Sequence, residues 1–239
     1  MISVFTDLPV AAGFTCKPAD GKAYREGLKA EGMVARLGLC HGTDIAVIRA
    51  EAVQQPLDVL KIAPTASWKN GYLDVDNVDG AVTDAPGVFL STTHGDCLPI
   101  WLADPVKGAV GLAHAGWRGS LAGIAGNLAR AMVRAFGSDP QDIRACIGPG
   151  IGTCCFEVGF DVADAFTDKY PWAEEYVYCP PKSRPHVDLK GINAEILALE
   201  GVSNLSVSSH CTCCEEDMFW SHRRSGDKTR MLAYIAWKG

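Results

Sequence analysis

The chain is organised around one stretch, Thr92-Thr93-His94-Gly95-Asp96-Cys97-Leu98-Pro99-Ile100-Trp101-Leu102-Ala103-Asp104-Pro105, which continues through Ala113-His114-Ala115-Gly116-Trp117-Arg118-Gly119. Apolar runs at 98–103 and 109–113 flank a turn-forming segment at 104–107, and this order predicts a β-hairpin. If residue 103 pairs with residue 108, Cys97 lies opposite His114. Opposed residues of a hairpin hold their Cβ atoms about 5 Å apart. The spacing therefore predicts a site for one metal ion or for one proton transfer.

A helix is expected directly after this stretch, at 120–136, because apolar side chains recur there with helical spacing. Ser120 is the candidate N-cap and Gly137 the candidate C′ residue. Residues 115–119 would then form a loop leading into a helix N-terminus, where backbone N–H groups favour an anion. Arg118 would add a bidentate contact to a phosphate or carboxylate. The alternative is a surface arginine in a tight turn.

Length and composition are those of a soluble globular protein. The 239 residues, 48% of them hydrophobic and 21% charged, fit one domain spanning 1–239. A net charge of −6 gives no reason to expect binding to nucleic acid or to an anionic membrane. We expect no signal peptide, because the N-terminus lacks a basic segment followed by an apolar core. We expect no transmembrane helix, because no apolar run reaches about 18 residues. The ten cysteines are then expected to be reduced thiols in the cytoplasm.

Strand-like and helix-like segments alternate along the chain, which predicts an α/β fold. Residues 51–80 are the least regular part and suggest a long excursion with a hairpin inside it, as in a lid or binding loop. Elsewhere we expect strands at 34–40, 45–48, 143–148, 205–208 and 229–237, and helices at 161–170 and 189–200.

Cys97 and His114 suit two chemistries, and the residues alone leave both open. A catalytic zinc site needs three protein ligands and one open position. Its third ligand would be His94 or His41, which interrupts two strand-like runs and is otherwise a turn residue. A cysteine hydrolase needs a thiolate, a base within hydrogen-bond reach and an orienting group. Cys97 and His114 would supply the first two.

Two later segments carry further candidates. The cluster His210-Cys211-Thr212-Cys213-Cys214 lacks the two spaced ligand pairs of a usual structural zinc site, so we expect packed thiols there ahead of zinc. The basic and aromatic segment 219–224 is expected to be a solvated loop, with an active-site wall as the alternative. The six histidines include no His-x-His pair, which argues against a conventional blue-copper laccase.

These motifs together resemble the laccase-domain, polyphenol-oxidase-like family of YfiH type. The resemblance covers about residues 34–237, and the pairing of Asp-Cys-Leu-Pro with His-Ala-Gly-Trp-Arg-Gly is specific. The matching motifs are His41-Gly42-Thr43-Asp44, Asp79-Gly80-Ala81-Val82-Thr83, Asp96-Cys97-Leu98-Pro99, His114-Ala115-Gly116-Trp117-Arg118-Gly119, Gly148-Pro149 with Cys154-Cys155-Phe156-Glu157-Val158, Cys211-Thr212, Ser221-His222-Arg223-Arg224 and Arg230-Met231.

The resemblance implies a zinc-dependent purine nucleoside phosphorylase, a transferase that would cleave adenosine, inosine or methylthioadenosine with phosphate and would also suit adenosine deamination. It implies metal ligands at His41, Cys97 and His114, with zinc as the ion or copper as the alternative. We take Cys97, His114 and Arg118 as catalytic candidates, and Arg118, Gly119 and His94 as substrate-binding candidates. The implied fold is a layered α+β sandwich with mixed sheets between helices, similar to the catalytic domain of cytotoxic necrotizing factor toxins.

Three other functions stay open on the sequence alone. A metal-free Cys–His hydrolase or amidase would act on cell-wall precursors or proteins. A copper-dependent polyphenol oxidase would oxidise phenols with oxygen. A non-catalytic binding protein would use the segment 51–78, where the chain is longer than is usual for the family, as its contact surface. The sequence gives no oligomeric state.

Overall fold

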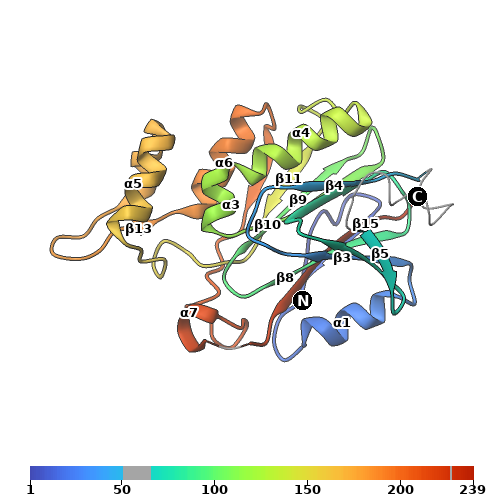
Figure 1. Ribbon diagram of the computed structural model, residues 1–239, viewed down its shortest axis with the longest axis horizontal. Helices are drawn as coiled ribbons and strands as arrows, with labels where there is room; N and C mark the ends of the chain where they lie inside the picture. Colours follow the sequence, from blue (N-terminus) through green and yellow to red (C-terminus); the bar gives the residue numbers. More distant parts are fainter. Residues whose placement is uncertain (51–65, 227) are drawn as a thin grey trace.

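Two β-sheets lie face to face and carry helices on their outer sides (Figure 1). The computed structural model describes residues 1–50, 66–226 and 228–239. Each sheet contains both parallel and antiparallel strand pairs. This arrangement confirms the expected α/β class with mixed sheets between helices.

The seven-stranded sheet holds both the first and the last strand of the described chain. It contains the hairpin of β5 (Ala66–Lys69) and β6 (Tyr72–Asp76), which turns at Asn70 and Gly71, both with positive φ, and matches the hairpin expected inside 51–80. The rest of that excursion, 51–65, lies outside the described residues. In spatial order the strands are β1 (Ile2–Ser3), β2 (Val10–Phe14), β15 (Met231–Trp237), β8 (Val88–His94), β3 (Met33–Gly38), β6 (Tyr72–Asp76) and β5 (Ala66–Lys69).

The six-stranded sheet carries the hairpin expected from the sequence. In spatial order its strands are β14 (Asn204–Val207), β11 (Arg144–Ile147), β9 (Leu98–Asp104), β10 (Ala109–Ala115), β7 (Gly80–Thr83) and β4 (Ile45–Ile48). A separate pair is formed by β12 (Val177–Tyr178) and β13 (His186–Val187).

Helices cover both outer faces of the sandwich (Figure 1). On the six-stranded sheet, α4 (Ile124–Phe136) packs on β10 and β7, and α6 (Leu189–Leu199) packs on β11 and β14. On the seven-stranded sheet, α1 (Gly21–Leu28) packs against β15, β3 and β8. Within the described residues the other helices are α3 (Trp117–Ala122), α5 (Phe160–Lys169), the 3-10 helix Pro171–Tyr176 and α7 (His222–Ser225).

The β9–β10 hairpin is buried on both faces. Since the side chains of a strand alternate between its two sides, they are shared between two cores. Trp101 and Val110 enter the core between the two sheets, whereas Ile100 and Leu102 enter the core beneath α4 and α6. Fully burying one such side chain stabilises the fold by about 1.5–3 kcal/mol. The hairpin is therefore a rigid base for the residues at its open end.

The register of this hairpin corrects the sequence prediction by two residues. Asp104 pairs with Ala109, and His114 pairs with Pro99, so Cys97 precedes the paired part of the strand instead of lying opposite His114. The four-residue loop is 105–108 instead of 104–107, and its last residue, Gly108, has a φ of 64°. A shift of two keeps every side chain on its predicted face, because the period of a strand is two. Cys97 and His114 therefore still meet.

The helix expected at 120–136 is in fact two helices. α3 begins at Trp117 and ends before Gly123, whose φ of 88° lies in the left-handed region, and α4 then continues to Phe136. Ser120 is consequently an internal residue of α3 and not an N-cap, which is Gly116. Gly137 ends α4 in the left-handed conformation, as predicted.

Candidate metal centre

Three residues of the site lie where the chain passes from the seven-stranded to the six-stranded sheet. His41 follows β3 and precedes β4, Asp79 follows β6 and precedes β7, and Cys97 follows β8 and precedes β9. Strand β10 lies between β7 and β9 and contributes His114 near its end. The two-sheet architecture thus gathers residues that are far apart in the sequence.

His41, Cys97 and His114 form a compact set of potential ligands. One ring nitrogen of each histidine and the Sγ atom of Cys97 all lie within 4.8 Å of one another. The two imidazole rings meet edge to face, with their centroids 5.1 Å apart. Gly116 keeps this space open, because a Cβ atom there would lie 3.1 Å from Cys97 Sγ and 3.2 Å from His41 Cδ2. His114 is buried and His41 exposed, so the set faces solvent on one side.

Asp79 holds both histidines in place. Its Oδ1 atom accepts a hydrogen bond from His114 Nδ1 at 3.0 Å, and its Oδ2 atom accepts from the backbone N–H groups of Cys40 and Gly42 at 3.1 and 2.7 Å. Those two amides flank His41, whose φ of 62° is in the left-handed region. Since Nδ1 of His114 donates to the carboxylate, its Nε2 lone pair is left for a metal, the usual arrangement behind a ligating histidine. Asp79 belongs to one of the family motifs, but nothing in the sequence indicated its contact with His114.

In the metal-free protein the same groups form a thiolate–imidazolium pair. Burial raises the pKa of Cys97, but hydrogen bonds from His114 and His41 outweigh it and lower the pKa to about 6. Burial lowers the pKa of His114, but hydrogen bonds to Asp79 and Cys97 outweigh it and raise the pKa to about 9. The pKa of the Asp79 carboxyl lies well below its usual range, because these hydrogen bonds overcome the effect of burial. Near neutral pH Cys97 is therefore a thiolate, the form that binds metals and attacks electrophiles.

His94 lies behind Cys97 and not on the cavity wall. Its side chain is 1% exposed, with Nε2 hydrogen-bonded to Thr92 Oγ1 at 2.8 Å and Nδ1 to the backbone carbonyl of Cys97 at 3.0 Å. Burial first, and then the nearby His114, lowers its pKa. With both ring nitrogens engaged, His94 supports the Cys97 backbone, and the structure favours His41 over His94 as the third ligand.

The structure gives Arg118 and Gly119 different surroundings from those expected. Arg118 lies in the first turn of α3, not in a loop; it is exposed and stacks on the Trp117 ring, with 4.3 Å between the guanidinium carbon and the ring centroid. Gly119 is buried where α3 meets the His41 loop, and a Cβ atom there would lie 3.1 Å from the Gly42 carbonyl oxygen. Gly119 is thus a packing residue, and Arg118 contacts the ring of Trp117.

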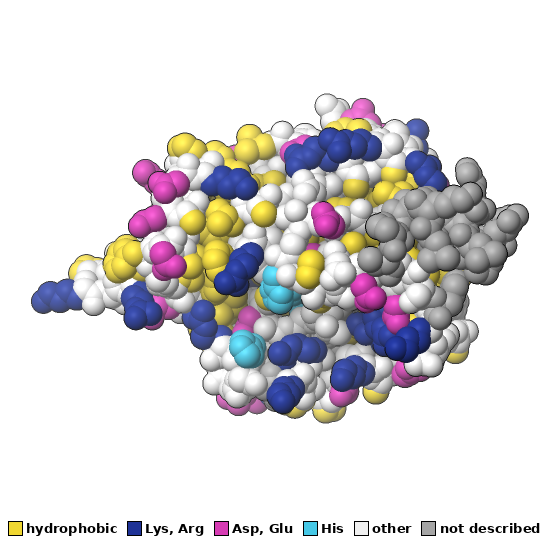
Figure 2. All heavy atoms as spheres, viewed as in Figure 1, with side chains coloured by type: hydrophobic (Ala, Val, Ile, Leu, Met, Phe, Trp, Pro, Cys, Tyr) yellow, Lys and Arg dark blue, Asp and Glu magenta, His cyan; other side chains and the backbone are white. Residues whose placement is uncertain are grey.

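Two adjoining cavities of about 330 and 150 Å³ open onto Cys97. On the face of the molecule shown in Figure 2, histidine side chains reach the surface near the middle, among lysine and arginine side chains. The larger cavity is lined by the three candidate ligands together with Leu39, Thr93, Gly95, His222 and Arg230. The smaller one adds Trp117, Ile151, Phe156, Leu189 and Arg223. Segment 219–224 therefore contributes His222 and Arg223 to the wall of these cavities, which corrects the expectation of a solvated loop.

Asp96 connects that wall to Cys97. Its carboxylate accepts hydrogen bonds from Thr212 Oγ1 and from the backbone N–H of Arg223, both at 2.7 Å. The Arg223 guanidinium in turn donates to the carbonyl oxygens of Cys155 and Glu157 at 2.9 and 3.0 Å. Three distant loops are thereby fixed against the residue that precedes the thiol.

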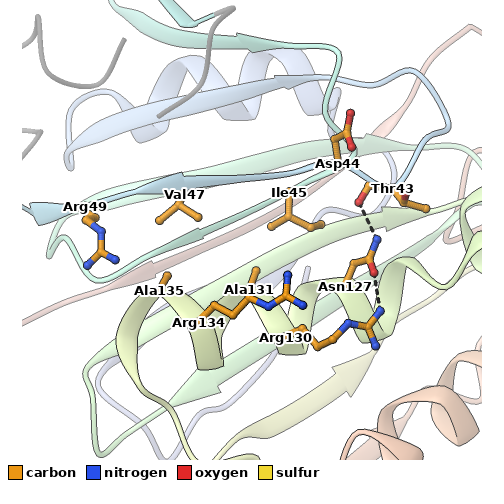
Figure 3. A pocket seen from close by; sticks show the side chains of 10 residues that line it. All are labelled: Thr43, Asp44, Ile45, Val47, Arg49, Asn127, Arg130, Ala131, Arg134 and Ala135. Carbon is orange, nitrogen blue, oxygen red and sulfur yellow. Dashed lines mark hydrogen bonds between the residues drawn. The ribbon is translucent and has the colours of Figure 1, made fainter. Parts of the chain in front are cut away.

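A larger hollow of about 540 Å³ lies between β4 and α4 (Figure 3). Arg49, Arg130 and Arg134 line it, and Arg130 is paired with Glu200. Asn127 donates to the Thr43 carbonyl oxygen at 3.2 Å, so this region braces the loop that carries His41 (Figure 3). Its described lining residues include no thiol and no imidazole, and the candidate chemistry is therefore at Cys97.

A two-sheet α/β sandwich with a His–Cys–His set at the floor of a cavity defines a class of candidate metalloproteins. The donor set fits such an ion, because it offers two imidazoles and a thiolate, has a carboxylate behind one histidine and leaves one side open. The chain belongs to the family described as multi-copper polyphenol oxidoreductase laccase, whose model matches residues 21–238. This confirms the resemblance seen in the motifs.

Curated relatives and solved structures agree with this assignment. The chain is 42% identical over 170 residues to the purine nucleoside phosphorylase YlmD of Geobacillus stearothermophilus, and this match covers 67% of the chain and 60% of the relative. It is 37% identical over 155 residues to the adenosine deaminase RL5 of an unknown prokaryotic organism, a match covering 64% of the chain and 59% of that relative. The crystal structure of the hypothetical protein YfiH of Bacillus licheniformis superposes with a TM-score of 0.80 at 30% identity, covering 96% of this chain and 93% of that one.

The described residues contain no helix that is long and apolar enough to cross a membrane.

Proposed function

We propose that this chain is a zinc-dependent purine nucleoside phosphorylase of the cytoplasm, acting on adenosine, inosine or methylthioadenosine with phosphate. The observation that carries the proposal is the open His41–Cys97–His114 set at the floor of the 330 Å³ cavity. The reaction comes from the relatives, which are named purine nucleoside phosphorylases. Three protein ligands with one free position are typical of catalytic zinc, whereas structural zinc has four.

Each residue has a definite part in this proposal. A zinc ion held by His41, Cys97 and His114 would act as a Lewis acid toward an oxygen of the substrate. Asp79 keeps the His114 ring in the orientation that leaves Nε2 for the ion. His222 and Arg230 line the same cavity and would bind phosphate, for which a guanidinium offers two parallel N–H donors. Trp117 and Phe156 line the smaller cavity and suit the flat, apolar face of a purine.

Phosphorolysis is tested by incubating the purified protein with inosine and inorganic phosphate and separating free base from nucleoside. We expect base release that requires phosphate and yields ribose 1-phosphate in equal amount. Base release that continues unchanged without phosphate would indicate a hydrolase and would overturn the proposal. Ammonia release from adenosine, measured in parallel, tests the deaminase activity suggested by the name of RL5.

A Cys–His hydrolase is the second candidate, and one observation favours it. Cys97 as thiolate, His114 as its partner and Asp79 behind His114 reproduce the order nucleophile, base and orienting carboxylate. This enzyme would keep its activity in the presence of a chelator and would lose it on alkylation of Cys97. The phosphorylase proposal requires the opposite response to the chelator.

A further inference from the structure

A second sulfur cluster lies beyond the cavity wall, outside the proposed centre. Cys154 and Cys155 follow β11, and Cys211 and Cys214 follow β14. The four Sγ atoms all lie within 4.8 Å of one another, and Cys214 Sγ is 3.4 Å from that of Cys154 and 3.3 Å from that of Cys155. The cysteine-rich segment 210–214 contributes only two of the four sulfurs, so its local spacing does not reveal the quartet.

The spacing of these sulfurs matches a single tetrahedral ion. Zinc binds thiolates at about 2.3 Å, which places the sulfurs of a tetrahedral site about 3.8 Å apart. In this quartet Cys214 Sγ lies 3.3 and 3.4 Å from its two neighbours and no two sulfurs are more than 4.8 Å apart, so the distances fall around that value. A polynuclear iron–sulfur cluster would hold its cysteine sulfurs farther apart, because several iron atoms lie between them. The geometry therefore favours one ion over a cluster.

The surroundings of Cys211 suit a negatively charged sulfur. The Gly152 N–H donates to Cys211 Sγ at 3.2 Å, and the backbone N–H groups of Cys213 and Cys214 also point to this sulfur. The Lys190 ammonium is 7% exposed and donates to the carbonyl oxygens of Ser208 and of His210, the residue before Cys211. Four thiolates around a divalent ion carry two excess negative charges, which these amides and the ammonium would offset.

We propose that Cys154, Cys155, Cys211 and Cys214 bind one zinc ion in a closed, structural site. Four protein ligands leave no position for substrate, so this ion takes no part in the reaction. It holds the loop after β11 to the loop after β14, which are otherwise joined by the Gly150–Cys211 bridge and the Thr212 N–H to Gly150 carbonyl bond. Both loops contribute to the cavity wall through Phe156 and through the Thr212–Asp96 hydrogen bond.

The proposal is tested by the zinc content of protein purified under reducing conditions without added metal. We expect two zinc ions per chain in the wild type, one in His41→Ala and one in Cys214→Ser. Cys213→Ser is the matched control, because its sulfur lies outside the quartet, and it should retain both ions. Cys214 is exposed, so its replacement by serine should leave the fold intact, which retention of the ion at His41 would verify.

Three results would overturn this inference. One is a wild type whose single zinc is lost in His41→Ala and kept in Cys214→Ser. Another is a Cys214→Ser protein that still holds two ions. The third is a disulfide between Cys214 and Cys154 or Cys155, detected as two unalkylated sulfurs in the non-reduced protein. Cobalt substituted into the His41→Ala variant gives a readout independent of turnover, because four thiolates should produce intense sulfur-to-cobalt charge-transfer absorption. Failure of the phosphorolysis assay would leave these expectations unchanged.

Discussion

The two sulfur-containing clusters of this molecule differ in almost every physical respect. The His41–Cys97–His114 set has three potential ligands of two kinds and borders a cavity of about 330 Å³. The cysteine quartet has four ligands of one kind and is surrounded by backbone amides and a buried ammonium. One set leaves a position for a reacting molecule, whereas the other leaves none. The number of ligands and the cavity that borders one of the two sets, more than the presence of cysteine, distinguish a site proposed for chemistry from one proposed for stability.

The largest effect is expected at Cys97, because it belongs to the open set. Cys97→Ala removes the only thiolate among the three ligands and should reduce phosphorolysis by more than about 100-fold, beyond the 10–100-fold typical of residues behind a ligand. Zinc content should fall by one ion per chain. Full turnover by a Cys97→Ala protein lacking that ion would remove the distinction between the clusters.

Asp79→Asn should have the next largest effect, about 10–100-fold on zinc affinity or turnover. A neutral side-chain amide has one acceptor oxygen and no negative charge. It therefore cannot accept hydrogen bonds both from His114 Nδ1 and from the two backbone N–H groups beside His41. Zinc affinity measured by competition with a chelator checks this expectation. The exposed Asp142→Asn serves as the control and should match the wild type. An Asp79→Asn protein with wild-type affinity would show that the carboxylate does not orient His114.

Arg230 and Arg118 give a smaller and more specific contrast. Arg230→Ala should raise the KM for phosphate by about 10–100-fold, since a hydrogen bond to a charged group is worth about 1.5–3 kcal/mol. Arg118→Ala should raise it by at most about fivefold, because Arg118 is exposed and lines neither cavity at Cys97. Steady-state kinetics at varied phosphate separates the two. A larger effect of Arg118→Ala than of Arg230→Ala would indicate that phosphate binds at the start of α3.

The mildest test uses pH on protein stripped of metal. The pKa of Cys97 is lowered to about 6, so its thiolate fraction rises as pH passes from 5 to 7 and is already complete near pH 8. The pKa of Cys154 is raised by burial to about 11, so that thiol stays protonated over the same range. Peptide-mapped alkylation with iodoacetamide should therefore label Cys97 before Cys154 at pH 7. Equal labelling rates would show that His114 and His41 do not stabilise the Cys97 thiolate.

Much of the architecture was predictable because it depends on local patterns. The two apolar runs and the turn residues between them located the β9–β10 hairpin. Because the side chains of a strand repeat with a period of two, a register error of two residues left Cys97 and His114 on the same face. The break at Gly123 was not predictable from the apolar stripe, which continues across it, since only the backbone φ of 88° reveals the end of α3.

The parts of the site that escaped prediction all depend on distant contacts. Asp79 contacts His114 across 35 positions, and Cys154 contacts Cys214 across 60. No local spacing encodes such pairs. The family motifs placed His41 among the ligands, but the role of Asp79 and the pairing of the four cysteines follow only from the stacking of the sheets and their loops.

The crossings at His41, Asp79 and Cys97 have a mechanical consequence. All three are segments by which the chain leaves one sheet and enters the other, so the ligand geometry depends on how the two layers are aligned. Sliding one layer over the other would pull His41 and Cys97 in a common direction relative to their own strands. An ion bound to both residues would oppose this relative displacement of the two sheets. The complete ligand set would form only after both sheets had assembled.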